Sequence, residues 1–340
     1  MASLKQIARD IGVSTATVSN ALTGKGRVSE ELAEKIRAHA EGLGYRPSSA
    51  ARALKTGQSG ILGLVMPDLT NPLFPRIAQN LSIAAEARGL GILIADSRGD
   101  DARQDEALAQ LVGRGVDGLI IVPKKGTTAP EIALPLVVIN TASDPRSTVS
   151  ADHLGGGRQL GAHVAGLGHA HVALLGGDAV SEVQQDRIRG MIAGLGPATR
   201  TEVVWGDAGM ARLPGLVAKG VSAVMATSDL LALGAHSHLS RAGLSVPGDV
   251  SLTGFDDLPL ATAMHPALTT IAQDVEAIAE QALDVLTRRI AGRPVDTPAS
   301  AVPMTLVLRQ STTTAAPRRL RAGAPASSPL PSETDPTGAN

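Results

Sequence analysis

Residues 4–24 read LKQIARDIGVSTATVSNALTG and contain the strongest structural signal in the chain. Apolar side chains fall at helical spacing over its first eight positions, at Leu4, Ile7, Ala8 and Ile11. Gly12 ends this helix, and Ser14 is a typical N-cap for a second helix that runs to about residue 22. Two short helices joined by a glycine turn predict a helix-turn-helix, and therefore an all-α head at the N-terminus.

The second helix exposes the side chains that would meet DNA. Three are suited to reading bases, because Asn can bond an adenine edge bidentately and methyl groups can contact a thymine methyl: Thr15, Ala16 and Asn20. Three hydroxyls are suited to phosphate contact or helix capping, which positions the head without reading sequence: Ser14, Thr17 and Ser19. The same pattern also fits a generic three-helix bundle with no affinity for DNA.

Charge is distributed unevenly along the chain. Residues 1–60 carry nine lysines and arginines against five acids, whereas the rest carries 22 against 27. A basic head on an acidic body suits a polyanion partner, although an ordinary solvated surface explains the charge equally well. A third helix, capped by Ser29 and stopped by Gly44, completes a head that we expect to span residues 1–46.

Residues 47–60 form a linker that opens with Pro47 and contains room for one short helix, up to Leu54. A helix of two turns is marginal in water because nucleation is costly. We therefore expect this helix to need a partner in order to stay folded.

Beyond the linker, short apolar runs alternate with helical stretches. The runs lie at 61–66, 90–95, 116–122, 135–139, 171–175, 202–205, 221–226 and 250–254. The helical stretches lie at 72–88, 101–113, 154–167, 183–195, 229–242 and 274–291. This alternation predicts parallel sheets, and the number of elements favours an α/β body of two doubly wound lobes. An extended run at 302–308 closes a body expected to span 61–312, and we expect residues 313–340 to be a disordered tail.

The composition agrees with a soluble α/β protein. Of the 340 residues 43% are hydrophobic but only 1% aromatic, so Ala, Val, Leu and Ile must build the core. There is no Cys, which excludes disulfides and thiolate chemistry. The N-terminus has no apolar signal sequence and no apolar run could cross a bilayer, so we expect a cytoplasmic protein.

Polar residues follow many of the predicted strands, where ligands bind in doubly wound sheets. They are Asp68, Asn71, Asp152, Ser228, Asp229, Asp256 and Asp257. Arg187, in the 183–195 helix, would oppose them, and a carboxylate facing an Arg fork is suited to the hydroxyl groups of a polyol. Asn71 is explained equally well as a helix N-cap before Pro72, and Asp229 and Asp257 as caps or interlobe partners.

An ordered series of motifs resembles the lactose-repressor (LacI/GalR) family as far as about Thr312. The motifs are IARDIGVSTATVSNALTGKGRVSEELAEKIRAHAEGLGYRPSSAARALKTGQSGILGLVMPDLTNPLF, RGVDGLIIVP, HVALLGG, RIRGMIAGL, SDLLALGA, VPGDVSLTGFDDLPLA and PALTTIAQD. The resemblance implies a periplasmic-binding-protein-like body and a nucleoid-associated homodimer on near-palindromic double-stranded operator DNA. It also implies that a small effector controls how tightly the head holds that DNA.

The resemblance assigns roles to the linker and the cleft. Leu54 matches the leucine that the family inserts into the minor groove, and Ala51 matches a neighbouring groove residue; packing of Leu54 on the linker itself is the alternative. The residues that match the family's effector contacts are Asp152, Arg187, Ser228 and Asp256. Those that match its apolar wall are Leu73 and Phe74.

Two departures from the family leave the type of sugar open. Ala208 stands where many sugar-binding members have an aromatic residue that stacks on the ligand, and Asn140 stands where many have Arg. The stacking platform is therefore absent at that position.

Other functions fit the sequence less well. The chain has no nucleophile elbow, no P-loop and no dinucleotide fingerprint, and its His residues lack metal-ligand spacing, so we predict neither catalytic residues nor a metal or cofactor. A solute-binding protein of a transporter would share the body but would need an export signal and no DNA head. We predict a repressor controlled by a sugar or sugar derivative, with a solute-binding protein or sugar-processing enzyme as the alternative.

Overall fold

The computed structural model describes residues 3–23, 26–45, 57–123, 132–144, 148–295 and 301–315. Most of the predicted linker, with Ala51 and Leu54, lies outside these residues, as does the predicted tail beyond Ala315. Within the described ranges, no helix is both long enough and apolar enough to span a membrane.

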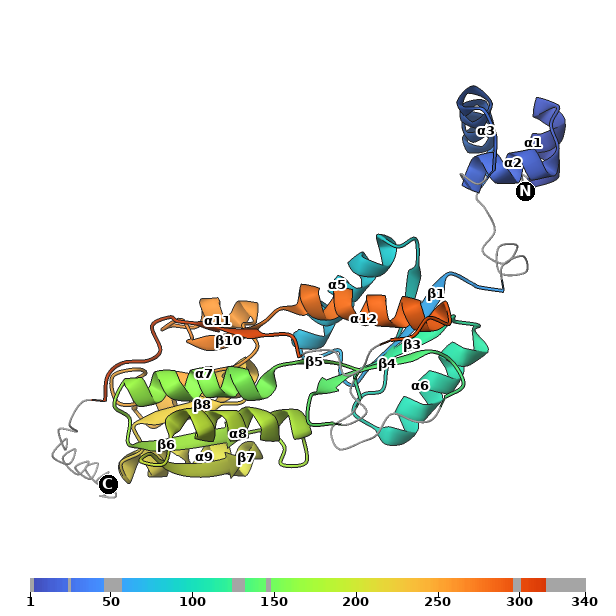
Figure 1. The fold of residues 1–340 in the computed structure, drawn as a ribbon. Helices are drawn as coiled ribbons and strands as arrows, with labels where there is room; N and C mark the ends of the chain where they lie inside the picture. The colour runs from blue at the N-terminus through green and yellow to red at the C-terminus, as the bar shows by residue number, and fades with distance from the viewer. Residues whose placement is uncertain are drawn as a thin grey trace, which may run out of the picture.

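The head is a helix-turn-helix followed by a third helix, which confirms the prediction (Figure 1). Its helices are α1 (Leu4–Ile11), α2 (Thr15–Thr23) and α3 (Glu30–Gly42). Ser3 caps α1, and Gly12 ends it in the left-handed region at φ +77°, which a residue without Cβ adopts at little cost. Each helix contributes one fully buried side chain to the centre of the head: Ile7, Val18 and Ile36.

The first lobe of the body is built on a five-stranded parallel sheet with the order β2-β1-β3-β4-β5. Its strands are β1 (Ile61–Met66), β2 (Gly91–Asp96), β3 (Gly118–Ile121), β4 (Leu136–Thr141) and β5 (Val149–Ala151). Its helices are α5 (Leu73–Glu86), α6 (Asp101–Gly113) and α12 (Val275–Ile290). In the central strand, Leu62 pairs with Ile92 on one side and Gly118 on the other. Polar residues that follow β1 and β3 therefore meet at one edge of this sheet.

The second lobe has a four-stranded parallel sheet with the order β7-β6-β8-β9. Its strands are β6 (His171–Gly176), β7 (Arg200–Trp205), β8 (Ala223–Ala226) and β9 (Ser251–Thr253), with an antiparallel pair, β10 (Thr270–Gln273) and β11 (Met304–Val307). Its helices are α7 (His153–Gly166), α8 (Glu182–Leu195), α9 (Gly206–Ala218), α10 (Asp229–Arg241) and the short α11 (Pro259–Ala263). The predicted pair of doubly wound lobes is confirmed.

The chain crosses between the lobes after β5, after β10 and again between α12 and β11 (Figure 1). Two of these crossings lie side by side, because Ala151 and Val302 form a parallel bridge and the amide of Asp152 donates to the carbonyl of Val302 at 2.8 Å. Residues next to the crossings, such as His153 and Gln273, therefore lie between the lobes.

Contacts with the second lobe continue past residue 312, the expected end of the body. The amide of Ala315 donates to the carbonyl of Leu167 at 2.8 Å, and the carbonyl of Thr313 accepts from the Ser251 hydroxyl at 3.3 Å. These contacts fasten the C-terminal strand region to the second lobe.

Helices α7 and α8 pack backbone against backbone through glycines. A Cβ on Gly157 would lie 2.3 Å from the carbonyl oxygen of Arg187, and one on Gly161 would lie 2.3 Å from that of Met191. On the facing helix, a Cβ on Gly190 would lie 2.2 Å from the carbonyl oxygen of Leu154. Only glycine permits this separation, which sets the position of α8 and of the side chains that it carries.

Candidate functional site

A cavity of about 1100 Å³ lies between the two lobes. Its walls are formed at the carboxyl ends of strands from both sheets, where doubly wound proteins bind ligands. The first lobe contributes Asp68, Asp96 and Asn140, which follow or end β1, β2 and β4. The second lobe contributes Gly177 and Thr227, which follow β6 and β8.

Seven of the eight residues predicted to contact an effector line this cavity: Asp68, Asn71, Leu73, Phe74, Arg187, Ser228 and Asp256. Asp152 is the exception, because its side chain caps α7 by accepting from the amide of Gly155 at 2.8 Å, and it is not part of the cavity wall. Asp152 does follow the end of a strand, β5, but the neighbouring His153 is the residue that lines the cavity.

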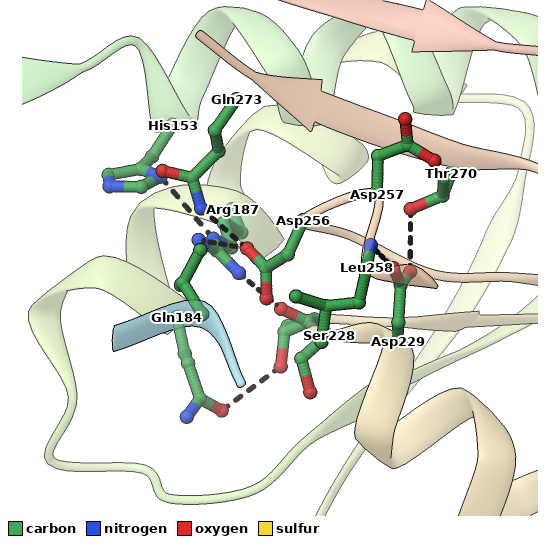
Figure 2. A network of polar contacts seen from close by, with 12 residues as sticks. His153, Gln184, Arg187, Ser228, Asp229, Asp256, Asp257, Leu258, Thr270 and Gln273 are labelled. Atoms are coloured by element: carbon green, nitrogen blue, oxygen red, sulfur yellow. Dashed lines mark hydrogen bonds and ion pairs between the residues drawn. The ribbon is translucent and has the colours of Figure 1, made fainter. Parts of the chain in front are cut away.

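Arg187 lies at the centre of the second-lobe wall and is 4% exposed (Figure 2). Its guanidinium forms an ion pair with Asp256 at 2.9 Å and donates to the Thr227 carbonyl at 2.6 Å. It also donates from Nε to Nδ1 of His153 at 3.3 Å and lies 4.2 Å from the centre of the Phe255 ring. These contacts fix the guanidinium plane before any ligand binds.

Asp256 is held in an unusual conformation. Its φ is +108°, which non-glycine residues rarely adopt, and its amide donates to the carbonyl of Ile271 at 2.8 Å. Gln273 donates to the same carboxylate oxygen that Arg187 contacts, at 2.6 Å. Burial raises the pKa of Asp256, and the charge of Arg187 acts against that rise. The second carboxylate oxygen can accept a ligand hydroxyl.

His153 is 6% exposed, and its surroundings favour the neutral ring. Burial, followed by the nearby positive charge of Arg187, lowers its pKa well below the usual range. Its ring lies 6.5 Å from that of Phe255, centre to centre. A neutral imidazole beside a buried ion pair supplies a directional polar contact without adding charge.

Asn71, Ser228 and Asp68 combine cavity lining with local turn contacts, and Asp68 accepts from the amide of Thr70 at 2.8 Å. Asn71 accepts from the amide of Leu73 at 3.1 Å, so the predicted capping role and the place in the cavity wall occur together. Ser228 caps α10 by accepting from the amide of Leu231 at 3.2 Å. These contacts hold each side chain in one orientation at the edge of the cavity.

Asp229 and Asp257 have structural contacts, as the sequence allowed. Asp229 is fully buried and accepts from the amide of Leu258 at 2.7 Å and the hydroxyl of Thr270 at 2.6 Å (Figure 2). Burial raises its pKa to about 7. The carbonyl of Asp257 accepts from Arg76 of α5 at 3.0 Å, which joins the two lobes.

The polar cavity residues that sequence reasoning missed include His153, Gln184, Thr227 and Gln273. Thr227 directly follows a predicted strand, so its position was a signal that could have been used. Gln273 ends a strand that the sequence pattern did not reveal, and the side chain of Gln184 is held by contacts with Gly177 and Thr227, neither of which lies on its own helix.

In the head, the structure exposes two of the predicted base-reading residues. Thr15 and Ala16 are exposed on α2, and Asn20 is half-buried. Ser14 and Thr17 bond to each other: the amide of Thr17 donates to the Ser14 hydroxyl at 3.0 Å, and the two hydroxyls lie 2.8 Å apart. This pair caps α2, while Ser19 is half-buried further along the helix.

Two family models match the chain. The description "Bacterial regulatory proteins, lacI family" matches residues 3–48, and "Periplasmic binding protein-like domain" matches residues 162–312. The chain is 31% identical to the ribose operon repressor of Escherichia coli (strain K12), over 85% of this chain and 93% of that protein.

Solved structures show the same similarity. A crystal structure of the Lac repressor dimer bound to operator and the anti-inducer ONPF superposes with a TM-score of 0.76 at 25% identity, covering 92% of this chain and 99% of that one. A LacI family regulator from Enterococcus faecium with bound ribose superposes with a TM-score of 0.66 at 26% identity, covering 75% of this chain and 100% of that one. The match thus includes both the head and the cavity-bearing body, and the chain belongs to the LacI family of bacterial regulatory proteins.

Proposed function

We propose that this regulator is a transcription repressor that binds an operator as a homodimer and is controlled by a sugar held between its two lobes. The observation that carries the proposal is the buried Arg187–Asp256 pair, which is already fixed in a cavity at the carboxyl ends of strands. The relatives support the class of effector, since one is named for a ribose operon and one solved neighbour contains ribose. The free oxygen of Asp256 would accept a sugar hydroxyl.

In this proposal, residues 1–46 read the operator and residues 47–60 connect them to the body. Thr15, Ala16 and Asn20 would contact base edges from α2, and Ser14, Thr17 and Ser19 would position the helix on the phosphates. Ala51 and Leu54 would enter the minor groove between the two heads. Such a protein acts in the cytoplasm, on the nucleoid.

The sugar would act by joining the lobes. A ligand that contacts Asn71 in one lobe and Asp256 in the other stabilises the closed arrangement, because it forms both sets of contacts only there. Closure would shift the first lobe, from which the linker emerges at β1, and so change how the two heads meet the operator.

Selection from a random duplex library, followed by fluorescence anisotropy, tests this proposal. We expect the full chain to enrich a near-palindromic sequence, and D-ribose or another sugar to change the affinity for it by about 5- to 150-fold. Enrichment of no sequence, together with no response to any sugar, would contradict the proposal.

A further inference from the structure

Gln184 has its amide oxygen fully occupied. It lies on α8 in the cavity wall, and its Oε1 accepts from the amides of Gly177 at 2.6 Å and Asp178 at 3.3 Å, and from the hydroxyl of Thr227 at 3.0 Å. A backbone N–H can only donate, so the atom that faces these two amides must be the oxygen. The amide nitrogen lies on the other side of the side chain, away from these contacts (Figure 2). Gln184 can therefore offer the cavity only N–H donors.

His153 is restricted in the same way. Its Nδ1 accepts from Nε of Arg187 at 3.3 Å, and arginine nitrogens do not accept hydrogen bonds. Since Nδ1 accepts, it carries no proton, and the proton of the ring lies on Nε2. Among the residues that the structure describes, Nε2 has no hydrogen-bond partner, and His153 lines the cavity. The ring therefore presents one fixed N–H donor.

The side chains of Gln184 and His153 lie in one wall of the cavity and are connected through Thr227 and Arg187. Gln184 and Arg187 lie three residues apart on α8 and so share a helix face, and both contact Thr227, through its hydroxyl and its carbonyl respectively. Arg187 in turn contacts His153. All three residues have donors left for a ligand, and none of them has a free acceptor.

We propose that Gln184 and His153 are specificity-determining residues that donate hydrogen bonds to acceptor oxygens of the effector, such as the ring oxygen of a sugar. The inference rests on the proposed function, because it concerns the same cavity and the same class of ligand. It also fixes the orientation of the ligand: acceptor oxygens face α8 and the first residue of α7, and a hydroxyl donates to Asp256. A ligand with N–H groups at that position would face donors and bind poorly.

Gln184→Glu tests the donor assignment sharply. The glutamate has the same shape and keeps an oxygen for Gly177, Asp178 and Thr227, but it replaces the NH₂ group with an acceptor. The probe is whichever of D-ribose, D-xylose, D-glucose and maltose binds the wild-type chain most tightly in calorimetry. We expect its affinity to fall about 10- to 100-fold, because two acceptors then face each other.

Gln185→Glu is the matched control. Gln185 is the next residue on α8 and donates to the carbonyl of Ala179 at 2.6 Å, and it does not line the cavity. This variant adds the same charge one position away, and we expect sugar affinity to stay at the wild-type value. His153→Phe, which keeps a planar ring and removes both nitrogens, should also weaken binding.

A second readout does not depend on any sugar. Long-range ¹H–¹⁵N NMR of the histidine rings should show His153 as the neutral tautomer with its proton on Nε2, at pH 7 and at pH 6. A proton on Nδ1, or equal binding by the wild-type chain and Gln184→Glu, would overturn the donor assignment and leave the proposed function standing. Failure of all four sugars to bind the wild-type chain would instead contradict the proposed class of effector, and the inference with it.

Discussion

At the scale of single residues, the site depends on charges that are buried and paired. Arg187 and Asp256 are 4% and 2% exposed, and each has other partners: Thr227 and His153 for the arginine, and Gln273 for the aspartate. Removing one member of such a pair leaves the other charged and desolvated, which costs far more than the pair itself contributes.

Asp256→Ala should therefore lower the free energy of unfolding by about 3–5 kcal/mol and abolish the sugar response. Arg187→Ala should cost a similar amount, and the double variant less than the sum of the two, as measured by urea unfolding. Asp284→Ala is the control, because the Asp284–Arg288 pair is half exposed on α12 and worth about 0–1 kcal/mol. Additive losses at Arg187 and Asp256 would show that the pair is not coupled.

Asp229 makes the stability of the body depend on pH. Burial raises the pKa of this group from 3.8 to about 7, so the folded chain holds a proton that the unfolded chain releases. The stability that the Asp229 carboxyl contributes is fully present below pH 3.8, its pKa in the unfolded chain. This stability is lost as the pH rises through about 7, its pKa in the folded chain.

Asp229→Asn should remove this dependence, since an amide can accept from Leu258 and donate to Thr270. The stability of the wild-type chain relative to the variant should fall by up to about 1.4 kcal/mol per pH unit between pH 4 and pH 7, then level off. Urea unfolding at pH 5, 6, 7 and 8 measures the difference. Parallel curves for the two proteins would show that Asp229 titrates at an ordinary pKa in the fold.

At the scale of secondary-structure elements, the glycine contact between α7 and α8 positions the site. Gly157 and Gly161 of α7 face Gly190 and Gly194 of α8, and Gly194 would place a Cβ 2.2 Å from the carbonyl oxygen of Arg158. Because Gln184 and Arg187 lie on α8, any increase in the distance between α7 and α8 would displace the N–H donors that these two side chains present to the cavity.

Gly161→Ala should cost about 1–3 kcal/mol of stability and weaken sugar binding, since its Cβ would overlap the Met191 carbonyl. Gly166→Ala provides the contrast in the same helix, because a Cβ there meets nothing within 4 Å and alanine favours helix by about 1 kcal/mol. Thermal melts and sugar titrations compare the two. If both substitutions had the same effect, helix propensity and not the close contact would set the stability of α7.

The sequence predicted elements with an uninterrupted pattern well and the remaining elements poorly. Runs such as 61–66 and 171–175 became β1 and β6 almost unchanged, because buried parallel strands require uninterrupted aliphatic side chains. Helix α9 was missed because glycines and Pro214 interrupt its pattern. Strands β5 (VSA) and β10 (TIAQ) mix polar with apolar residues over three and four positions, so they form no continuous aliphatic run of the kind that revealed β3 and β8. Gln273 was missed for this reason, since it lies at the end of β10.

At the scale of the whole molecule, one carboxylate of the body contacts two residues at the end of the linker. Asp117, in the turn before β3, accepts from the amide and hydroxyl of Ser59 at 2.7 and 3.0 Å and from the amide of Gly60 at 2.7 Å. We therefore expect a movement of the first lobe to displace Ser59 and Gly60, at the end of the segment that leads to the head.

Asp117→Ala should reduce the coupling between sugar and operator, which is about 1–3 kcal/mol in proteins of this kind. Calorimetry with sugar alone should give unchanged affinity, whereas the ratio of operator affinities with and without sugar should move towards one. Asp100→Ala serves as the control, because Asp100 caps α6 in the same lobe without touching the linker. A full response in Asp117→Ala would exclude this tether from the coupling.

The most direct test of the whole account is the affinity of the full chain for its selected duplex, measured by fluorescence anisotropy at low salt with and without sugar. Wild-type protein should bind that duplex at least about 1000-fold more tightly than a random one, and Asn20→Ala should lose roughly 1–3 kcal/mol at one base pair. Saturating sugar should shift the wild-type affinity and leave that of Asp256→Ala unchanged. Equal binding to selected and random duplexes, with no shift on adding sugar, would contradict the account.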